Sequence, residues 1–236
     1  LLEGIAYARE HKGQFLVGKA HREAEQLLAE LRKEKSIIRM EVAGSLRRRK
    51  EVVKDIDILV SSDAPEGLMK RFTEAPNVDR ITGHGATKSS VVLKSGMAAD
   101  LRVVSDAEFP YALAYFTGSK EHNVVMRQRA KERGLKLNEY GLLRADESNV
   151  PCKDEADIYK ALDLPFVPPE LREDRGEFAA ATLPRLLEQS DLAGVIHCHS
   201  TYSDGKATLE QMARAARDRG YKYFGIADHS QSAAYA

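Results

Sequence analysis

Two aspartates separated by one residue, Asp55 and Asp57, mark the part of the sequence best suited to do chemistry. They open the apolar run DIDILV, and because the side chains of a strand alternate between its faces, both carboxylates point to the same side. Parallel carboxylates repel each other unless a cation lies between them. Mg²⁺ binds one or two carboxylates together with substrate phosphate oxygens, so this pair predicts metal-assisted transfer of a nucleotidyl group.

A third carboxylate, Asp100, lies in a second predicted strand that spans residues 98–104. The apolar residues 91–93, followed by Ser95 and Gly96, predict a hairpin that leads into this strand. If the strand pairs beside the first one, three carboxylates converge, which is enough to hold two metal ions about 3.5–4 Å apart. The alternative is that Asp100 only solvates an edge strand.

A turn that suits a phosphate group precedes the acid pair. Gly44 allows the backbone to approach a triphosphate closely, and the amides at the start of the following segment favour anions. Arg47 and Arg48 can grip phosphate oxygens in a bidentate manner. A second glycine-rich stretch, residues 83–89, faintly suggests a P-loop, but Thr87 stands where that motif requires glycine, so we expect a hairpin loop there.

An aromatic pair, Tyr115 and Phe116, ends a predicted helix at residues 110–116. Such a pair can lie flat against a sugar and base, and Gly118 permits close approach of the backbone. The alternative is that both rings belong to the core at the end of the helix.

The run from Gly44 to Tyr140 resembles the palm and the nucleotide-selecting subdomain of family X DNA polymerases, the DNA polymerase beta-like group. The resemblance is carried by the motif YFTGS at 115–119, by Asn123, by Met126 with Arg127, and by residues 138–140. It implies that three acids hold the catalytic metals, namely Asp55, Asp57 and Asp100. It implies triphosphate contacts for Gly44, Ser45 and Arg48, and sugar contacts for Tyr115, Phe116 and Gly118.

The remaining roles that the resemblance implies concern the bases and the DNA. Asn123 is expected to contact the incoming base, and Arg127 and Tyr140 are expected to contact DNA. Arg102 follows the third acid and is expected to organise the carboxylates. The sequence departs from the family at Ala98, where vertebrate members tend to have a basic residue.

A second group of chemistry-bearing residues lies near residue 236, in His197-x-His199, Asp204 and His229. His and Asp at the C-terminal mouths of successive strands are typical metal ligands. Together with Ser-Asp-Gly and Asp-His-Ser, they resemble the opening of a PHP domain, a metal-dependent phosphoesterase barrel. The resemblance implies one metal shared by His197 and His199 and another by Asp204 and His229, as Mn²⁺ or Zn²⁺. With only two strands, we expect an incomplete site.

These patterns divide the chain into five predicted parts, with an α+β palm of mixed sheet and helices at their centre. We expect the end of an upstream helical DNA-binding region (1–17), a nucleotidyltransferase palm (18–106), a small helical and β subdomain that selects the nucleotide (107–166), a linker (167–190) and the start of an α/β PHP barrel (191–236). The chain reads as a fragment that is cut at both ends.

Charge and composition limit the function further. The 36 basic and 36 acidic residues balance, but residues 41–54 carry five Lys or Arg against two Glu, and residues 119–136 carry six against two. Residues 163–178 have the opposite sign, with five acids against two Arg. Such local basic patches are typical of contacts with a phosphate backbone. Two distant cysteines exclude a disulfide framework, and the absence of a long apolar run excludes a membrane span.

We therefore expect a cytoplasmic, monomeric, template-directed DNA polymerase that fills gaps in base excision repair. It would extend a primer 3′-hydroxyl on gapped or primer-template DNA, using dNTPs and two Mg²⁺ or Mn²⁺ ions. The resemblance to the PHP domain implies a 3′-5′ exonuclease in the parent protein. The alternative is a DNA-binding module with an inactive polymerase site.

Overall fold

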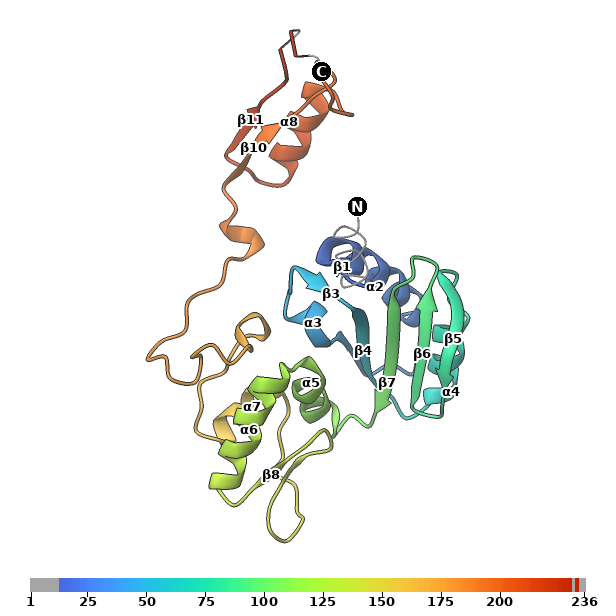
Figure 1. The fold of residues 1–236 in the computed structure, drawn as a ribbon, viewed down its shortest axis with the longest axis vertical. Helices are drawn as coiled ribbons and strands as arrows, with labels where there is room; N and C mark the ends of the chain where they lie inside the picture. The colour runs from blue at the N-terminus through green and yellow to red at the C-terminus, as the bar shows by residue number, and fades with distance from the viewer. Residues whose placement is uncertain (1–12, 231, 234–236) are drawn as a thin grey trace, which may run out of the picture. The chain divides into compact units, whose positions relative to one another are not determined.

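The computed structural model describes residues 13–230, 232 and 233, and it divides into two compact units after Leu183 (Figure 1). The helical segment expected at residues 1–12 lies outside the described residues. Each unit is described by itself. No described helix is both long enough and apolar enough to cross a membrane.

A five-stranded mixed sheet forms the centre of the first unit (Figure 1). Its strands lie in the order β2 (Arg39–Val42), β4 (Asp55–Ser61), β7 (Ala98–Val104), β6 (Lys88–Leu93) and β5 (Val78–His84). All neighbours are antiparallel except β4 and β7, which run parallel. The α+β sheet expected from the sequence is confirmed, and residues 83–89 form the β5–β6 hairpin rather than a P-loop.

Helices α2 (Val17–Leu31) and α4 (Pro65–Thr73) cover one face of this sheet. The apolar side chains of α2 recur at helical spacing, and five of them are buried on its inner face: Ala20, Ala24, Leu27, Leu28 and Leu31. They pack on the strand residues that alternate toward them, among them Ile56 and Ile58 on β4 and Ala99 and Leu101 on β7. The acids of β4 and β7 occupy the alternate positions and therefore face the other way.

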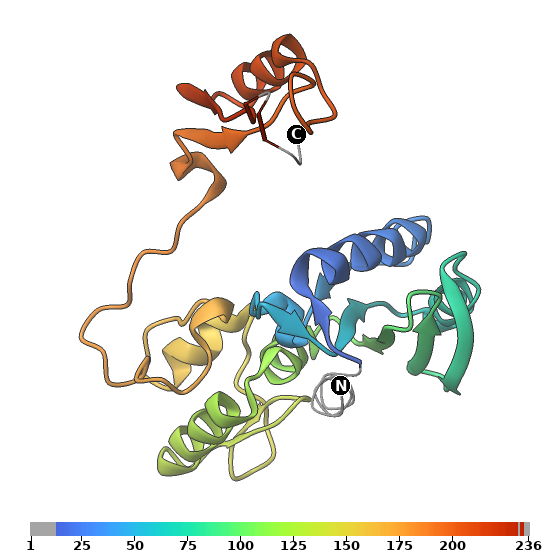
Figure 2. The same ribbon diagram turned by 45° about the horizontal axis from the view of Figure 1, so that its top comes forward.

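The opposite face is covered at one end by α5 (Phe109–Thr117), which packs on Leu59 of β4. Figure 2 shows the green and yellow helices on the side of the sheet opposite the blue helix α2. These helices are α5, α6 (Lys120–Glu132) and α7 (Glu155–Ala161), and a small hairpin, β8 (Lys136–Leu137) with β9 (Leu142–Leu143), joins them. The subdomain has its own core, centred on Tyr111, Met126 and Tyr159.

Two expected boundaries need correction. Within the expected upstream segment 1–17, the described residues from Phe15 onward instead join the palm, because β1 (Phe15–Leu16) pairs with β3 (Val52–Val53) and α2 begins at Val17. The expected linker 167–190 is packed in its first part, through Pro169–Leu171 (η1) and the residues around it: Val167 and Arg172 are fully buried, and Phe178 packs on the subdomain core.

The second unit is a single βαβ unit. A 3₁₀ turn, η2 (Gln189–Asp191), leads into β10 (Gly194–Cys198), α8 (Leu209–Asp218) and β11 (Tyr223–Ile226), and the two strands are parallel. A capping box at Thr208 starts α8. The side chains of Ile196 and Tyr223 remain 70% and 55% exposed, as expected for a two-stranded sheet with little to cover it.

Candidate active site

The three acids lie on the two parallel strands at the centre of the sheet. Asp57 of β4 is the direct partner of Asp100 on β7, and Asp55 lies two residues before Asp57 on the same face. Because parallel strands in register place equivalent side chains beside one another, the sheet itself brings the carboxylates together. The expectation that the Asp100 strand pairs beside the Asp55–Asp57 strand is confirmed.

The carboxylate of Asp57 lies against the turn that precedes it. Gly44 has φ +60° and opens the short helix α3 (Gly44–Arg47), and a Cβ at this position would collide with the Asp57 carboxylate. Two features of this position therefore require glycine: the positive φ, and the lack of space for a Cβ beside Asp57. The backbone N–H of Ala43 donates to the Asp57 carbonyl at 2.8 Å, which fixes the turn beside the acid.

Without a cation between them, the three carboxylates repel one another, and burial further disfavours the charged forms of Asp55 and Asp57. Burial, followed by the negative charges of Asp55 and Asp100, raises the pKa of Asp57 to about 6. Burial and then Asp100 also raise the pKa of Asp55. A bound cation would relieve this repulsion. The ligand atoms are all carboxylate oxygens, which suits Mg²⁺ or Mn²⁺.

Two cationic side chains lie at the edge of this acid group. The ammonium of Lys88, on β6, is 2.9 Å from Asp100 Oδ2. The guanidinium of Arg102 lies 4.3 Å from the centre of the Phe116 ring, and its Nε is buried without a hydrogen-bond partner. Both charges lower the pKa of Asp57, although less than burial and the neighbouring acids raise it. Arg102 thus lies beside the aromatic pair on the face that carries the acids, and its expected role in organising the carboxylates stays a prediction.

A groove of about 350 Å³ runs beside these residues, between the sheet and the subdomain. Lys88, Arg102, Phe116 and Tyr140 are among its lining residues. Tyr115 and Phe116 are half-buried, and their rings meet edge to face with centroids 5.1 Å apart. Phe116 also packs on the small core beneath α5, so the core alternative describes part of its surroundings.

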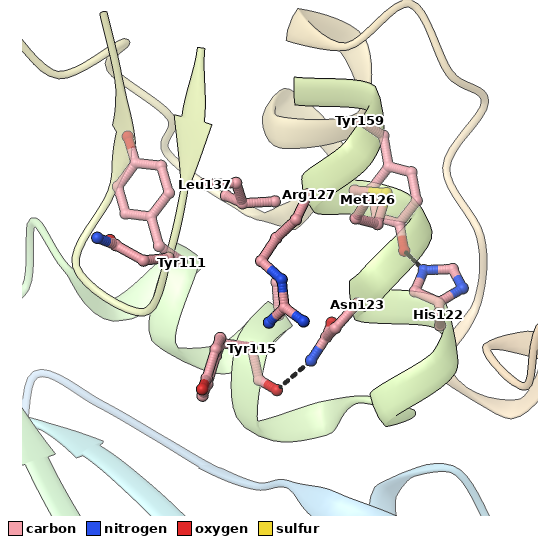
Figure 3. A pocket seen from close by; sticks show the side chains of 10 residues that line it. Tyr111, Tyr115, His122, Asn123, Met126, Arg127, Leu137 and Tyr159 are labelled. Atoms are coloured by element: carbon pink, nitrogen blue, oxygen red, sulfur yellow. Dashed lines mark hydrogen bonds between the residues drawn. The ribbon is translucent and has the colours of Figure 1, made fainter. Parts of the chain in front are cut away.

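The expected base and template contacts gather in an adjoining pocket between α5 and α6 (Figure 3). Tyr115, Asn123 and Arg127 line it, and Asn123 Nδ2 donates to the Tyr115 carbonyl at 2.7 Å. Tyr140 is largely exposed and lies on the groove described above rather than in this pocket. The three acids thus share one face of the sheet, and Tyr115, Asn123 and Arg127 line a pocket of the subdomain; the roles expected for all these residues stay predictions.

Arg48 does not project freely toward a phosphate. Its Nε donates to Glu173 at 2.8 Å and its Nη1 donates to the Thr117 carbonyl at 2.5 Å. The guanidinium passes close to Gly118, whose φ of +71° again suits glycine. The expected phosphate grip would therefore use the donors that these two contacts leave.

A buried ion cluster that the sequence analysis missed joins this turn to the subdomain. Arg47 binds the Glu155 carboxylate through two hydrogen bonds of 3.0 and 2.6 Å, and Arg172 binds it at 2.5 Å. Although burial opposes it, hydrogen bonds from the two arginines hold the pKa of Glu155 below its usual value. The opposite charge of residues 41–54 and 163–178 corresponds to other ion pairs, such as Arg48 with Glu173 and Arg49 with Glu170, and the sequence carries no signal for Glu155.

The second unit holds a different group of candidate ligands. His199, Asp204 and His229 each offer one ligand atom, and these atoms lie within 4.8 Å of one another. His197 is not part of this group, but its ring centroid lies 5.3 Å from that of His199, so the expected division into His197 with His199 and Asp204 with His229 stays a prediction. A bulge between Val195 and Cys198 and a positive φ at His197 break the regular alternation that would place both histidines on one face.

Asp228 is a further residue of this unit that the sequence analysis did not single out. Its carboxylate accepts hydrogen bonds from the backbone N–H of Ser200 and from the hydroxyls of Ser200 and Ser203, at 2.6–2.7 Å. These bonds lower the pKa of Asp228 and tie the loop after β10 to the end of β11. The loop carries Asp204, so Asp228 holds a candidate ligand in place without being one.

Comparisons with known proteins agree with this geometry. Residues 112–173 match the family model described as DNA polymerase beta thumb. The chain is 37% identical to "DNA polymerase/3′-5′ exonuclease PolX" of Bacillus subtilis over 98% of its own length, but it spans only 41% of that relative. It is 30% identical to "Repair DNA polymerase X" of African swine fever virus over 141 residues, which are 55% of this chain and 78% of the viral protein.

A solved structure shares the fold. The structure of Leishmania infantum polymerase beta in a ternary P/T complex superposes with a TM-score of 0.61, covering 72% of this chain and 80% of that chain at 22% identity. The in-register acids, the family model and the coverage of the viral relative lead to one conclusion: this chain belongs to the family X DNA polymerases.

Proposed function

We propose that this chain is the core of a template-directed DNA polymerase, which acts as a monomer on gapped or primer-template DNA and adds dNTPs to a primer 3′-hydroxyl during gap-filling repair. The single observation that carries the proposal is the register of β4 and β7, which sets Asp57 beside Asp100 and Asp55 on the same face. Nothing in the packing of a sheet requires three carboxylates at this position.

The acid site suits the metals that such a reaction uses. Family X polymerases use divalent metal ions, and in this chain Asp55, Asp57 and Asp100 would hold them as Mg²⁺ or Mn²⁺. The raised pKa of Asp57 supports this fit, because a bound cation relieves the repulsion that raises it. Two such ions supply activation of the attacking oxygen and stabilisation of the leaving group.

The other side chains would bind and orient the substrates. Ser45 and the free donors of Arg48 would hold the triphosphate, and the Tyr115–Phe116 pair would lie against the sugar, where its bulk disfavours a ribose. Asn123 would contact the incoming base, whereas Arg127 and Tyr140 would contact DNA. Catalysis would then consist mainly of positioning and charge stabilisation, since the template selects the base by pairing.

We also propose a second activity at the level of the whole protein, since this chain spans only 41% of its Bacillus subtilis relative. The Bacillus subtilis relative is named as both a polymerase and a 3′-5′ exonuclease, and the His199, Asp204 and His229 group offers N and O ligands that suit Mn²⁺ or Zn²⁺. A phosphoesterase site of the PHP kind would use these residues together with further ligands. Within the structure, the observation that supports this second candidate is the ligand group.

Primer extension on a duplex with a one-nucleotide gap tests the proposal. We expect template-directed addition with Mg²⁺ or Mn²⁺, and loss of addition in Asp57→Ala while DNA binding persists. A folded, DNA-binding wild-type chain that adds no nucleotide would instead support the alternative of a DNA-binding module with an inactive site.

A further inference from the structure

Lys88 is the one described side chain that forms an ion pair with an acid of the candidate metal site. It begins β6, and in the sheet register it stands opposite Arg102, while Ser90, two residues later, stands opposite Asp100. Lys88, Ser90, Asp100 and Arg102 therefore share one face of the sheet. A diagonal neighbour across two antiparallel strands is within reach of a long side chain, which explains the 2.9 Å contact between Lys88 Nζ and Asp100 Oδ2.

The surroundings of Asp100 make this contact informative. On its own strand, the neighbours on the same face are Ala98, which has no charge, and Arg102, whose guanidinium lies over the Phe116 ring. The remaining acids, Asp55 and Asp57, add negative charge beside Asp100. Lys88 thus supplies a positive charge directly on the acid group, at an oxygen of Asp100 that is a candidate metal ligand.

We propose that Lys88 is a positioning residue that serves as a removable counter-ion for Asp100, holding its carboxylate within the acid group until a divalent metal replaces the ammonium. The inference rests on the proposed function, because it takes the three acids to be the metal site. A flexible, half-exposed lysine suits this role, since it can move into solvent at little cost when a doubly charged ion arrives.

The proposal has a consequence that a purely structural ion pair would not have. The ammonium and the metal repel each other and compete for the same carboxylate, so removing the ammonium should strengthen metal binding. An exposed pair of this kind corresponds to about a two- to fivefold change in affinity. A lysine that only stabilises the hairpin would leave the metal affinity unchanged or weaken it.

Titration of the whole chain with Mn²⁺ alone, followed by electron paramagnetic resonance of the free ion, tests the inference. The sites that disappear in Asp57→Asn are assigned to the acid group, which separates them from binding by the second unit. We expect Lys88→Met and Lys88→Gln to bind Mn²⁺ at these sites about two- to fivefold more tightly than wild type, and Lys88→Arg to bind it as wild type does.

Lys94→Met is the matched control, because Lys94 carries the same charge just past the opposite end of β6. Tighter binding in both Lys88 variants and unchanged binding in Lys94→Met would support the proposal. Equal or weaker binding in folded Lys88→Met and Lys88→Gln, or an equal gain in Lys94→Met, would overturn it. If wild type has no Mn²⁺ site that Asp57→Asn removes, the proposed metal site fails instead.

Discussion

The two candidate metal sites of this chain are built in opposite ways. In the first unit, Asp55, Asp57 and Asp100 project from the middle of a five-stranded sheet whose other face is sealed by α2 and α4. In the second unit, His199, Asp204 and His229 come from loops at the ends of two strands whose apolar residues remain exposed. The first site is fixed by strand register, and the second depends on loop contacts such as those of Asp228.

This difference teaches how each site tolerates change. A site set by register keeps its geometry as long as the sheet is intact, so a substitution there removes chemistry rather than structure. A site set by loops has fewer buried contacts to hold it, and its ligands adjust more easily. The ligand atoms differ as well, since an all-oxygen site favours Mg²⁺ or Mn²⁺ and a histidine-containing site favours Zn²⁺ or Mn²⁺.

The largest expected effect is on the rate of primer extension, which should depend on the acid group of the first unit and not on the histidine group of the second. Asp100→Ala removes a carboxylate from the acid group and is expected to lower primer extension by about 10³-fold or more, since groups that act as a unit are lost together. His199→Ala is expected to change it by less than about twofold. Single-turnover primer extension with both variants makes the comparison, and equal losses would mean that the two units share one catalytic site.

The next effect concerns the buried charges that join α3 to the subdomain. Glu155→Ala leaves Arg47 and the fully buried Arg172 without their carboxylate, and the expected cost in the free energy of unfolding is about 3–5 kcal/mol. Asp204→Ala, which removes a half-exposed carboxylate from the second unit, is expected to cost about 1 kcal/mol or less. Urea unfolding of both variants measures the difference, and similar costs would contradict it.

A smaller effect follows from the pKa of Asp57. Because its folded pKa is about 6 rather than 3.8, its contribution to stability is complete below pH 4 and is lost as the pH rises through 6. In metal-free buffer at pH 7, Asp57→Asn is therefore expected to stabilise the first unit by about 2 kcal/mol, and to do so less at pH 4.5. Thermal unfolding with a chelator measures this, with the exposed Asp63→Asn as control.

The smallest effect tests the boundary between the units. A chain that ends at Leu183 keeps the residues that pack on the subdomain, so its first unit should unfold within about 2 °C of the full chain. A chain that ends at Phe166 loses Arg172 and Glu177 and should be clearly less stable. Equal unfolding temperatures for the two shortened chains would mean that residues 167–183 do not stabilise the first unit, as expected of a linker at residues 167–190.

The palm could be predicted from the sequence because local patterns determine it. The alternation in DIDILV placed Asp55 and Asp57 on one face, and residues 98–104 were predicted as the strand that carries Asp100. The sequence analysis could state the pairing of β4 with β7 only as an assumption, because the order of strands in a sheet depends on contacts between distant residues.

The parts that failed depend on contacts between distant residues or on irregular backbone. Arg47, Glu155 and Arg172 are far apart in sequence, and charged residues are usually exposed, so nothing local predicts that they are buried together. Likewise, the alternation expected at His197 assumed a regular strand, whereas the chain bulges between Val195 and Cys198 and His197 has a positive φ. The site residues themselves stay predictions until a metal or substrate is observed.

Crystals of the chain with gapped DNA and a dNTP, soaked in Mn²⁺, would test the central claim most directly through anomalous scattering. We predict manganese peaks between Asp55, Asp57 and Asp100, with the triphosphate beside Ser45 and Arg48. Peaks at His199, Asp204 and His229 alone, with none at the acids of β4 and β7, would contradict the account.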